Sequence, residues 1–151
     1  MGENSQNTNL ASEYYVLSML YRIGADAYLT LGNKKSVDIV VVKGGETLTI
    51  DVKGLKGTTN FPIDNVNKQD EKHYLIFVSF LNNIADPGCL PEVYIVPSQA
   101  LALEHEEIGN QSLMYQNPKG NRRVVQLSRL RKTYKRYKDK WEYFVESPIV
   151  L

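Results

Sequence analysis

The sequence contains little of what several classes of protein require. A single cysteine, Cys89, among 151 residues excludes an internal disulfide and a cysteine-rich metal site. No apolar run approaches the roughly 18 residues that a membrane-spanning helix needs. The N-terminal segment MGENSQNTN is polar and lacks the apolar region of a secretion signal. We therefore expect a cytoplasmic protein that has no membrane partner.

Two common kinds of catalytic signature are also missing. There is no glycine-rich loop of the kind that holds nucleotide phosphates, and no strand–turn–helix elbow that presents a nucleophilic serine. The two histidines, His73 and His105, are isolated and lack the spacing of metal ligands, so packing explains both better than catalysis does. Nucleotide hydrolysis and serine hydrolase chemistry therefore have no support in the sequence.

Charge is distributed unevenly, although the net charge is only +1. The segment from 119 to 140 contains ten Lys and Arg side chains and one acid, Asp139, which leaves eight basic and sixteen acidic side chains in the rest of the chain. A basic segment attached to a mildly acidic body is typical of proteins that bind nucleic acid. A solvated helix face explains the same charges equally well.

Hydrophobic periodicity predicts one domain over residues 9–151, preceded by a polar tail, residues 1–8, that we expect to be disordered. The expected elements are a helix over 9–22, strands over 27–31, 37–42 and 46–53, a helix-like segment over 65–72, strands over 74–80 and 92–96, and a helix over 98–105. The run YLIFVSF at 74–80 is almost continuously apolar, as a central strand would be. A basic helical segment over about 119–145 follows, with apolar residues at helical spacing at Leu127, Leu130, Tyr134, Tyr137 and Trp141, and the pattern leaves open a break of the helix near Tyr137. This order predicts a mixed α/β (α+β) fold around a central sheet.

The segment SVDIVVVKGGETLTIDVKG, residues 36–54, predicts a hairpin closed by Gly44-Gly45. Gly-Gly suits a two-residue turn because both positions can need a positive φ. In that register Ile39 faces Ile50 and Asp38 faces Asp51. One face of the hairpin is then entirely apolar, while the other carries both aspartates and Lys53.

Two carboxylates that face each other across a sheet destabilise it, because opposed Cβ atoms lie only about 5 Å apart. Mg²⁺ neutralises such a pair well, since it prefers oxygen ligands and is usually held by one or two carboxylates with water and phosphate. Lys53 projects from the same face, where its ammonium can stabilise negative charge on a phosphate or position an attacking water. The alternative is an ordinary salt-bridge cluster in which Lys53 bridges the two aspartates.

A third carboxylate belongs to the first helix. Glu13 shares a face with Val16, Leu17 and Leu20, which lie three, four and seven residues further on, so helical phase points it inward. Alone, Glu13 is explained by its favourable interaction with the helix N-terminus. Together with Asp38 and Asp51 it makes three acids for one base, which favours a catalytic site over a salt-bridge cluster.

Glu13 on the first helix, Ser36-Val37-Asp38 on a strand and Asp51-Val52-Lys53-Gly54 on the next strand resemble the PD-(D/E)XK, or restriction-endonuclease-like, nuclease superfamily. The resemblance spans about residues 10–96 and includes the order helix, three strands, helix, strand. It implies a restriction-endonuclease-like core around a central mixed sheet, to which a C-terminal strand and helices are added. One departure is that Ser36-Val37 stands where a proline often precedes the first aspartate.

The resemblance implies a metal-dependent nuclease that hydrolyses phosphodiester bonds, with DNA as the favoured substrate and endonuclease as the favoured action. Asp38 and Asp51 would bind Mg²⁺, or Mn²⁺ in its place, Glu13 would bind it directly or through water, and Lys53 would be the catalytic lysine. A homodimer is one assembly that the resemblance implies. The alternative function is a catalytically inactive module of the same fold that binds nucleic acid or a protein partner. Under the nuclease hypothesis, the side chains that contact the nucleic-acid backbone would be Lys56, Arg122, Arg123, Arg129, Lys132, Lys135 and Arg136.

Overall fold

The computed structural model describes residues 2–30, 37–63, 70–102, 114–116, 123–147 and 149. Helix α1 (Gly2–Arg22) comes first, and it is followed by β1 (Asp26–Leu29), β2 (Ile39–Lys43) and β3 (Glu46–Leu55). Next come β4 (Asn60–Ile63), β5 (His73–Ser79) and β6 (Glu92–Pro97), and residues 98–102 are helical. The remaining elements are β7 (Met114–Gln116), β8 (Arg123–Gln126), α3 (Leu127–Thr133) and the 3₁₀ turns η2 (Lys135–Tyr137) and η3 (Trp141–Phe144). None of the described helices is long and apolar enough to cross a membrane.

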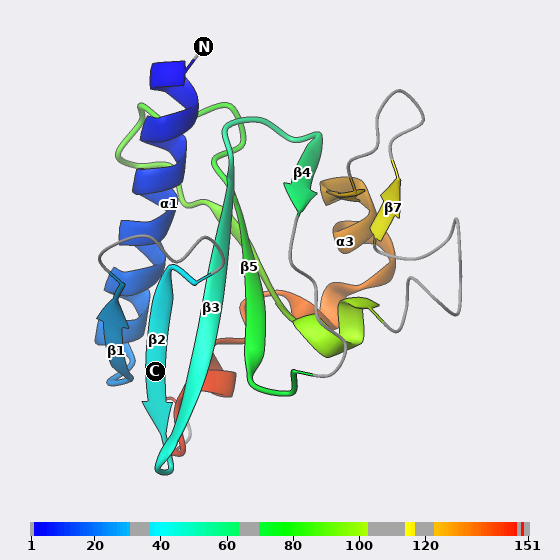
Figure 1. The fold of residues 1–151 in the computed structure, drawn as a ribbon. Coiled ribbons are helices and arrows are strands. Elements are labelled where there is room, and N and C mark those ends of the chain that lie inside the picture. Colours follow the sequence, from blue (N-terminus) through cyan, green and yellow to red (C-terminus); the bar gives the residue numbers. More distant parts are fainter. Residues whose placement is uncertain are drawn as a thin grey trace.

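Five strands form a central sheet in the order β1-β2-β3-β5-β6 (Figure 1). β3 and β5 pair in parallel, whereas the other neighbours are antiparallel, so the sheet is mixed. A smaller antiparallel sheet contains β4, β8 and β7 in that order. Helix α1 packs against β3 and β1, and in Figure 1 β4, β7 and α3 lie on the other side of β5. The predicted mixed α/β fold around a central mixed sheet is thus confirmed.

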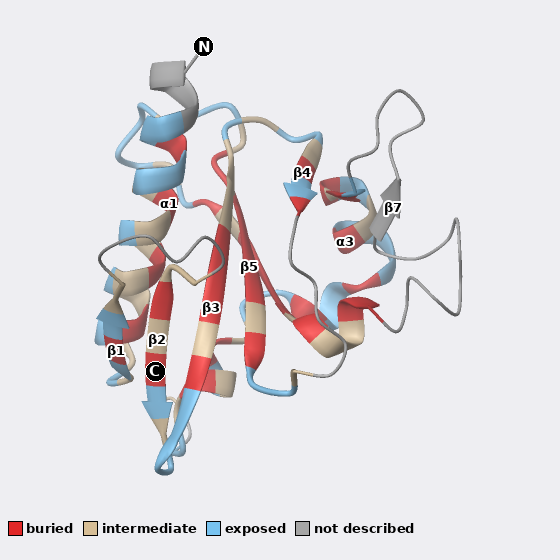
Figure 2. Ribbon diagram, viewed as in Figure 1, coloured by how far each residue is buried: buried red, intermediate tan, exposed pale blue. Residues whose placement is uncertain are grey.

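Apolar side chains cover both faces of the central sheet, though not equally. On one face, α1 and η3 pack against the strands in a core that includes Val16, Leu20, Ile50, Val52 and Trp141. On the other face, the smaller sheet, α3 and η2 cover β5 and β6, in a core that includes Phe61, Phe77, Leu127 and Tyr137. β5 is therefore buried along almost its whole length (Figure 2), as its apolar run predicts.

The β2–β3 hairpin has the predicted register. Val41 pairs with Leu48, and Ile39 pairs with Ile50. Gly44 and Gly45 have φ angles of 58° and 77°, the left-handed backbone that two-residue hairpin turns favour. The turn at one end of the hairpin therefore fixes which residues face each other at the other end, where the aspartates lie.

The N-terminal end of the chain differs from the prediction, and the structure decides how far the C-terminal segment is helical. α1 begins at Gly2, whereas we expect from the sequence a disordered tail over 1–8. Thr8 is buried and its carbonyl accepts a hydrogen bond from the Ser12 hydroxyl, so packing extends the helix into a polar sequence. The basic segment is interrupted close to Tyr137, where the sequence leaves a break open: α3 ends at Thr133, and the chain continues as η2 and η3. Asp139 has a φ of 52°, which interrupts the helical path between these two turns.

The sequence does not predict the strands of the smaller sheet. β4 contains Pro62 and lies in the segment GLKGTTNFPIDN, whose composition indicates a loop. The proline is tolerated because β4 is at the edge of this sheet. Most of the helix-like segment expected over 65–72, and the part of the 98–105 helix beyond 102, lie outside the described residues.

Replacing Gly45 tests the turn. Gly45→Ala should lower the free energy of unfolding by about 1–2 kcal/mol, because a left-handed backbone costs an L side chain about this much. No atom lies within 4 Å of the place its Cβ would take, so the loss isolates backbone strain from collision. Gly45→Asn should lose less, since asparagine adopts this backbone more readily. Urea unfolding measures the stability of both variants. Equal stability of Gly45→Ala and the wild type would contradict the left-handed backbone of Gly45 in this turn.

Candidate active site

Asp51 and Lys53 lie on the face of β3 that is turned away from α1. Their neighbours Ile50 and Val52 belong to the core beneath α1, and side chains alternate between faces along a strand. On the Asp51 face, the smaller sheet and α3 cover β5 and β6, whereas Tyr28 of β1 is 54% exposed. The aspartate and the lysine therefore lie at the boundary between a covered and an open part of the sheet.

Asp38 lies where β2 separates from β3. The paired residues end at Ile39 and Ile50, and the Asp38 N–H donates to the Ile50 carbonyl at 2.8 Å. The Oδ2 atom of Asp38 accepts a hydrogen bond from the Val52 N–H at 2.8 Å. Asp38 is thus bonded to the residues on both sides of Asp51, instead of forming the simple ladder pair that the sequence predicts. The two carboxyl groups are still neighbours that interact with each other.

Asp51 is a buried carboxylate whose charge is incompletely compensated. It is only 4% exposed. Its Oδ2 lies 3.2 Å from Lys53 Nζ, yet this oxygen receives no well-directed hydrogen bond from the described residues. Burial raises the pKa of Asp51 to about 7, since the opposing effect of Lys53 is smaller and the Asp38 carboxyl group adds to the rise. The Lys53 side chain is 22% exposed, so its ammonium can reach a ligand on the open face.

Helix α1 packs on the opposite face of the sheet and brings Glu13 to Asp38, at the point where β2 separates from β3. Burial raises the pKa of Glu13 to about 7, helped by a hydrogen bond with the Asp38 side chain and by the negative charges of Asp38 and Asp51. A hydrogen bond between two carboxyl groups needs a proton on one of them. Glu13, Asp38, Asp51 and Lys53 therefore form one group, called here the acidic cluster, in which three acids share one base.

The acidic cluster fits a magnesium ion in part. Among the described residues, no three His, Cys, Asp or Glu side chains are already arranged to hold a metal ion. Mg²⁺ is nevertheless typically held by one or two carboxylates with water and phosphate, and Asp38 and Asp51 supply two. The Asp51 oxygen without a directed hydrogen bond is an atom that a cation would compensate. The residues therefore fit an ion held by two carboxylates better than one held by three.

His73 lies on the same face of the sheet, which the sequence does not reveal. It pairs with Thr49 of β3, and its Nδ1 shares a hydrogen bond of 2.7 Å with Thr49 Oγ1. His73 is buried, and burial lowers its pKa while the charges of Asp70 and Asp38 oppose this. Thr49 is two residues before Asp51 on β3. The register of a parallel pair joined by a long crossover has no local sequence signal.

The basic side chains expected to contact nucleic acid differ in exposure. Arg136 lies over two tyrosine rings, with its Cζ 4.9 Å from the centroid of Tyr134 and 4.5 Å from that of Tyr137. Arg131 makes hydrogen bonds of 2.7 to 3.1 Å to both carboxylate oxygens of Glu92, so it holds α3 against β6. Arg122 lies outside the described residues, Arg129 is half-buried, and the exposed members are Lys56, Arg123, Lys132, Lys135 and Arg136.

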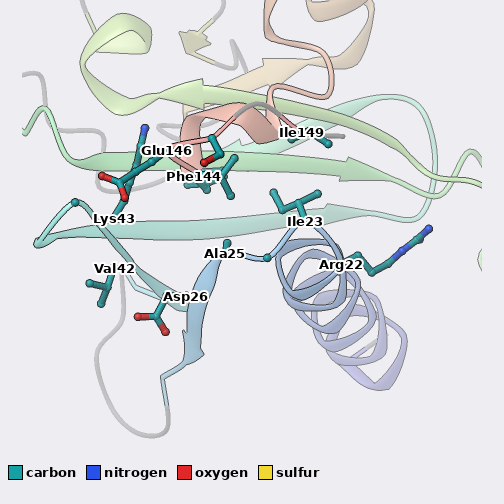
Figure 3. A pocket seen from close by; sticks show the side chains of 13 residues that line it. Arg22, Ile23, Ala25, Asp26, Val42, Lys43, Phe144, Glu146 and Ile149 are labelled. Carbon is teal, nitrogen blue, oxygen red and sulfur yellow. The ribbon is translucent and has the colours of Figure 1, made fainter. Parts of the chain in front are cut away.

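A cavity of about 500 Å³ lies at the other end of the hairpin (Figure 3). It is lined by the end of α1, by Val42, Lys43 and Gly44, and by side chains near η3 such as Phe144 and Glu146. No residue of the acidic cluster lines it. The candidate site is therefore defined by the acidic cluster and the open sheet face beside it.

Comparison with known proteins agrees with a nuclease-like fold. No protein-family model matches the chain, and no curated protein sequence matches it at a significant level. Among solved structures, the chain is similar to a bacterial homing endonuclease, I-Ssp6803I, with a TM-score of 0.52 and 13% sequence identity. The similarity covers 92% of this chain and 90% of that chain. Identity at this level shows a shared fold, so an argument about chemistry must come from the residues themselves.

The raised pKa values of Glu13 and Asp51 predict a dependence of stability on pH. Both groups bind a proton more tightly in the folded chain, so their stabilising contribution is fully present below their unfolded pKa values, 4.5 and 3.8, and is lost as pH rises through about 7. Asp51→Asn should therefore raise the free energy of unfolding at pH 8 without divalent cations. The difference in the free energy of unfolding between Asp51→Asn and the wild type should become smaller towards pH 5.

Urea unfolding at pH 5 and pH 8 measures this difference between the variant and the wild type. Glu71→Gln is the matched control, since Glu71 is an exposed acid outside the acidic cluster, and it should show no gain at pH 8. An Asp51→Asn variant that loses as much stability at pH 8 as at pH 5 would contradict the raised pKa of Asp51.

Proposed function

We propose that this protein is a magnesium-dependent endonuclease of the PD-(D/E)XK type that hydrolyses phosphodiester bonds in DNA. The observation that carries the proposal is the acidic cluster, which joins three carboxyl groups and one ammonium at the open end of a hairpin. The nuclease-like fold, shared with a homing endonuclease, supports it. Crowded carboxyl groups with strongly shifted pKa values are found more often at functional sites than in purely structural roles.

Asp38 and Asp51 would hold the metal ion, and Glu13 would bind it directly or through water. Bound Mg²⁺ supplies charge stabilisation for the phosphoryl group and lowers the pKa of a bound water. The protein contributes orientation, because the Val52 N–H fixes Asp38 Oδ2 and the Lys53 ammonium lies against Asp51 Oδ2. Lys53 would also bind the phosphate oxygen on which negative charge develops during hydrolysis.

The DNA would lie across the open part of the sheet and reach the basic C-terminal segment. Among the described residues, β1 and β2 contribute no side chain to the core beneath the smaller sheet, and β3 reaches it only at Leu55. Exposed Lys56, Arg123, Lys132 and Lys135 supply positive charge for phosphate contacts, which position a duplex without distinguishing its bases. A homodimer in which each subunit cuts one strand stays a prediction.

Cleavage should depend on a divalent cation and on the acidic cluster. Plasmid DNA incubated with the wild type and Mg²⁺ or Mn²⁺ should be nicked or linearised, and a chelator should stop the reaction. Asp51→Ala and Lys53→Ala should each lower the rate by about 100-fold or more, since removing one charge-stabilising group commonly costs about 10²–10³ in rate. Glu71→Ala is the matched control and should cleave as the wild type does.

Cleavage that survives both Asp51→Ala and Lys53→Ala would contradict the assignment. A wild type that binds DNA in a salt-dependent way, yet neither cleaves it nor binds Mn²⁺ in calorimetry, would instead favour a catalytically inactive module. One observation favours the inactive binding module as the second candidate function. No ready set of three metal ligands exists among the residues that the structure describes.

The basic segment should contribute to DNA affinity through phosphate contacts. Lys132→Ala and Lys135→Ala should each weaken binding similarly for all sequences, and should reduce the slope of log K against log salt by about 0.9 for each lost contact. Fluorescence anisotropy over a range of NaCl concentrations measures the slope. Lys72→Ala is the control, since Lys72 pairs with Glu46 near the hairpin turn. An unchanged slope in both variants would exclude these lysines from the DNA interface.

A further inference from the structure

Gly54 of β3 lies against α1 with no room for a side chain. A Cβ at this position would overlap Ser12 Oγ, and it would come within 3.0 Å of both Ser12 Cβ and the Thr8 carbonyl oxygen. Ser12 is completely buried, and its hydroxyl donates to the Thr8 carbonyl at 2.7 Å. One turn of α1 therefore occupies the space that any larger residue at Gly54 would need.

The backbone does not require glycine at this position. Unlike Gly44 and Gly45, Gly54 has no positive φ, and it pairs with Val78 in the regular parallel register of β3 and β5. A glycine in the interior of a strand weakens the strand, and it often marks a close approach of another backbone. The structural effect of Gly54 is therefore the short distance between α1 and β3.

Both partners of this contact adjoin the acidic cluster. Ser12 precedes Glu13 in α1, and Gly54 follows Lys53 in β3. Glu13 contacts the Asp38 carboxyl group from the helix, whereas Asp38 is bound to β3 through the Val52 N–H. A movement of α1 away from β3 would separate Glu13 from Asp38 but would leave the two aspartates of the hairpin in place.

We propose that Gly54 and Ser12 are positioning residues whose contact sets how closely α1 approaches β3 and thereby holds Glu13 beside Asp38. The inference rests on the proposed function, because it concerns the part that Glu13 plays in binding the metal ion. It assigns a role in the site to two residues that have no catalytic chemistry of their own.

Gly54→Ala should lower the cleavage rate and the affinity for Mn²⁺ by about 10- to 100-fold, the usual effect of disturbing a group that orients a metal ligand. Its affinity for DNA without metal should remain that of the wild type, because the basic segment is untouched. Adding Ser12→Gly should restore most of the activity, since it removes the Oγ and Cβ atoms that the new methyl group would meet and leaves only the Thr8 carbonyl oxygen at 3.0 Å to move slightly. Ser18→Gly is the matched control. It places the same residue type at an exposed position of α1 and should not restore activity.

A double-mutant cycle with Glu13→Gln tests whether the effect passes through Glu13. In that background Gly54→Ala should cause no further loss. Fully additive losses, unchanged cleavage by Gly54→Ala, or equal effects of Ser12→Gly and Ser18→Gly would each overturn the positioning role and leave the proposed function standing.

Circular dichroism shows whether Gly54→Ala folds. If it does not fold, Ser12→Gly is compared with the Ser12→Gly/Gly54→Ala pair, and these two should cleave at similar rates. A pair that folds but does not cleave would overturn the positioning role. A wild type that neither cleaves DNA nor binds Mn²⁺ is a different result, because it overturns the proposed function itself and this role with it.

Discussion

Repulsion among three carboxyl groups at the end of one hairpin is the constraint on which the rest of the arrangement depends. The turn at Gly44-Gly45 fixes the strands that carry Asp38 and Asp51, and the close packing of α1 on β3 adds Glu13. Each contact that brings these groups together also removes water from them, so burial and like charge act in the same unfavourable direction. The two apolar cores offset this destabilisation. Local interactions that oppose folding and are held by the surrounding structure are typical of functional sites.

The two faces of the central sheet are covered to different extents, so the site contains both a buried side chain and one that solvent can reach. α1 and η3 cover one face, while the second core covers the other face at β5 and β6. The bidentate Arg131–Glu92 pair, extended by the hydrogen bond from the Tyr94 hydroxyl to Glu92, fixes α3 over that covered half. Asp51 is consequently buried while Lys53 beside it is partly exposed. A site at such a boundary can exclude water from its charges and still admit a polymer too large for an enclosed cavity.

Local rules predicted the parts of this structure that local interactions determine. The register of β2 and β3 follows from a two-residue turn and alternating side chains, and the interior position of β5 in the sheet follows from its apolar run. Distant pairings had no such signal, which is why the smaller sheet and the position of His73 beside Thr49 were missed. The departure of Asp38 from the ladder involves its hydrogen bonds to Ile50 and Val52, which no residue pattern specifies. The break of the basic segment near Tyr137 stayed open in the sequence because Tyr134 and Tyr137 are three residues apart, a spacing that suits an α-helix and a 3₁₀ turn alike.

The short turn between β2 and β3 also has a consequence for the order of folding. A hairpin closed by two residues can form within about 1–10 μs, whereas the parallel pairing of β3 with β5 joins distant parts of the chain and forms more slowly. Asp38 and Asp51 therefore approach each other early, while water still surrounds them and weakens their repulsion. The repulsion grows as α1 packs over the hairpin and takes water away from the carboxyl groups. The unfavourable contribution of the site thus comes from the packing of α1 and the neighbouring elements around the hairpin, and not from the closing of the hairpin itself.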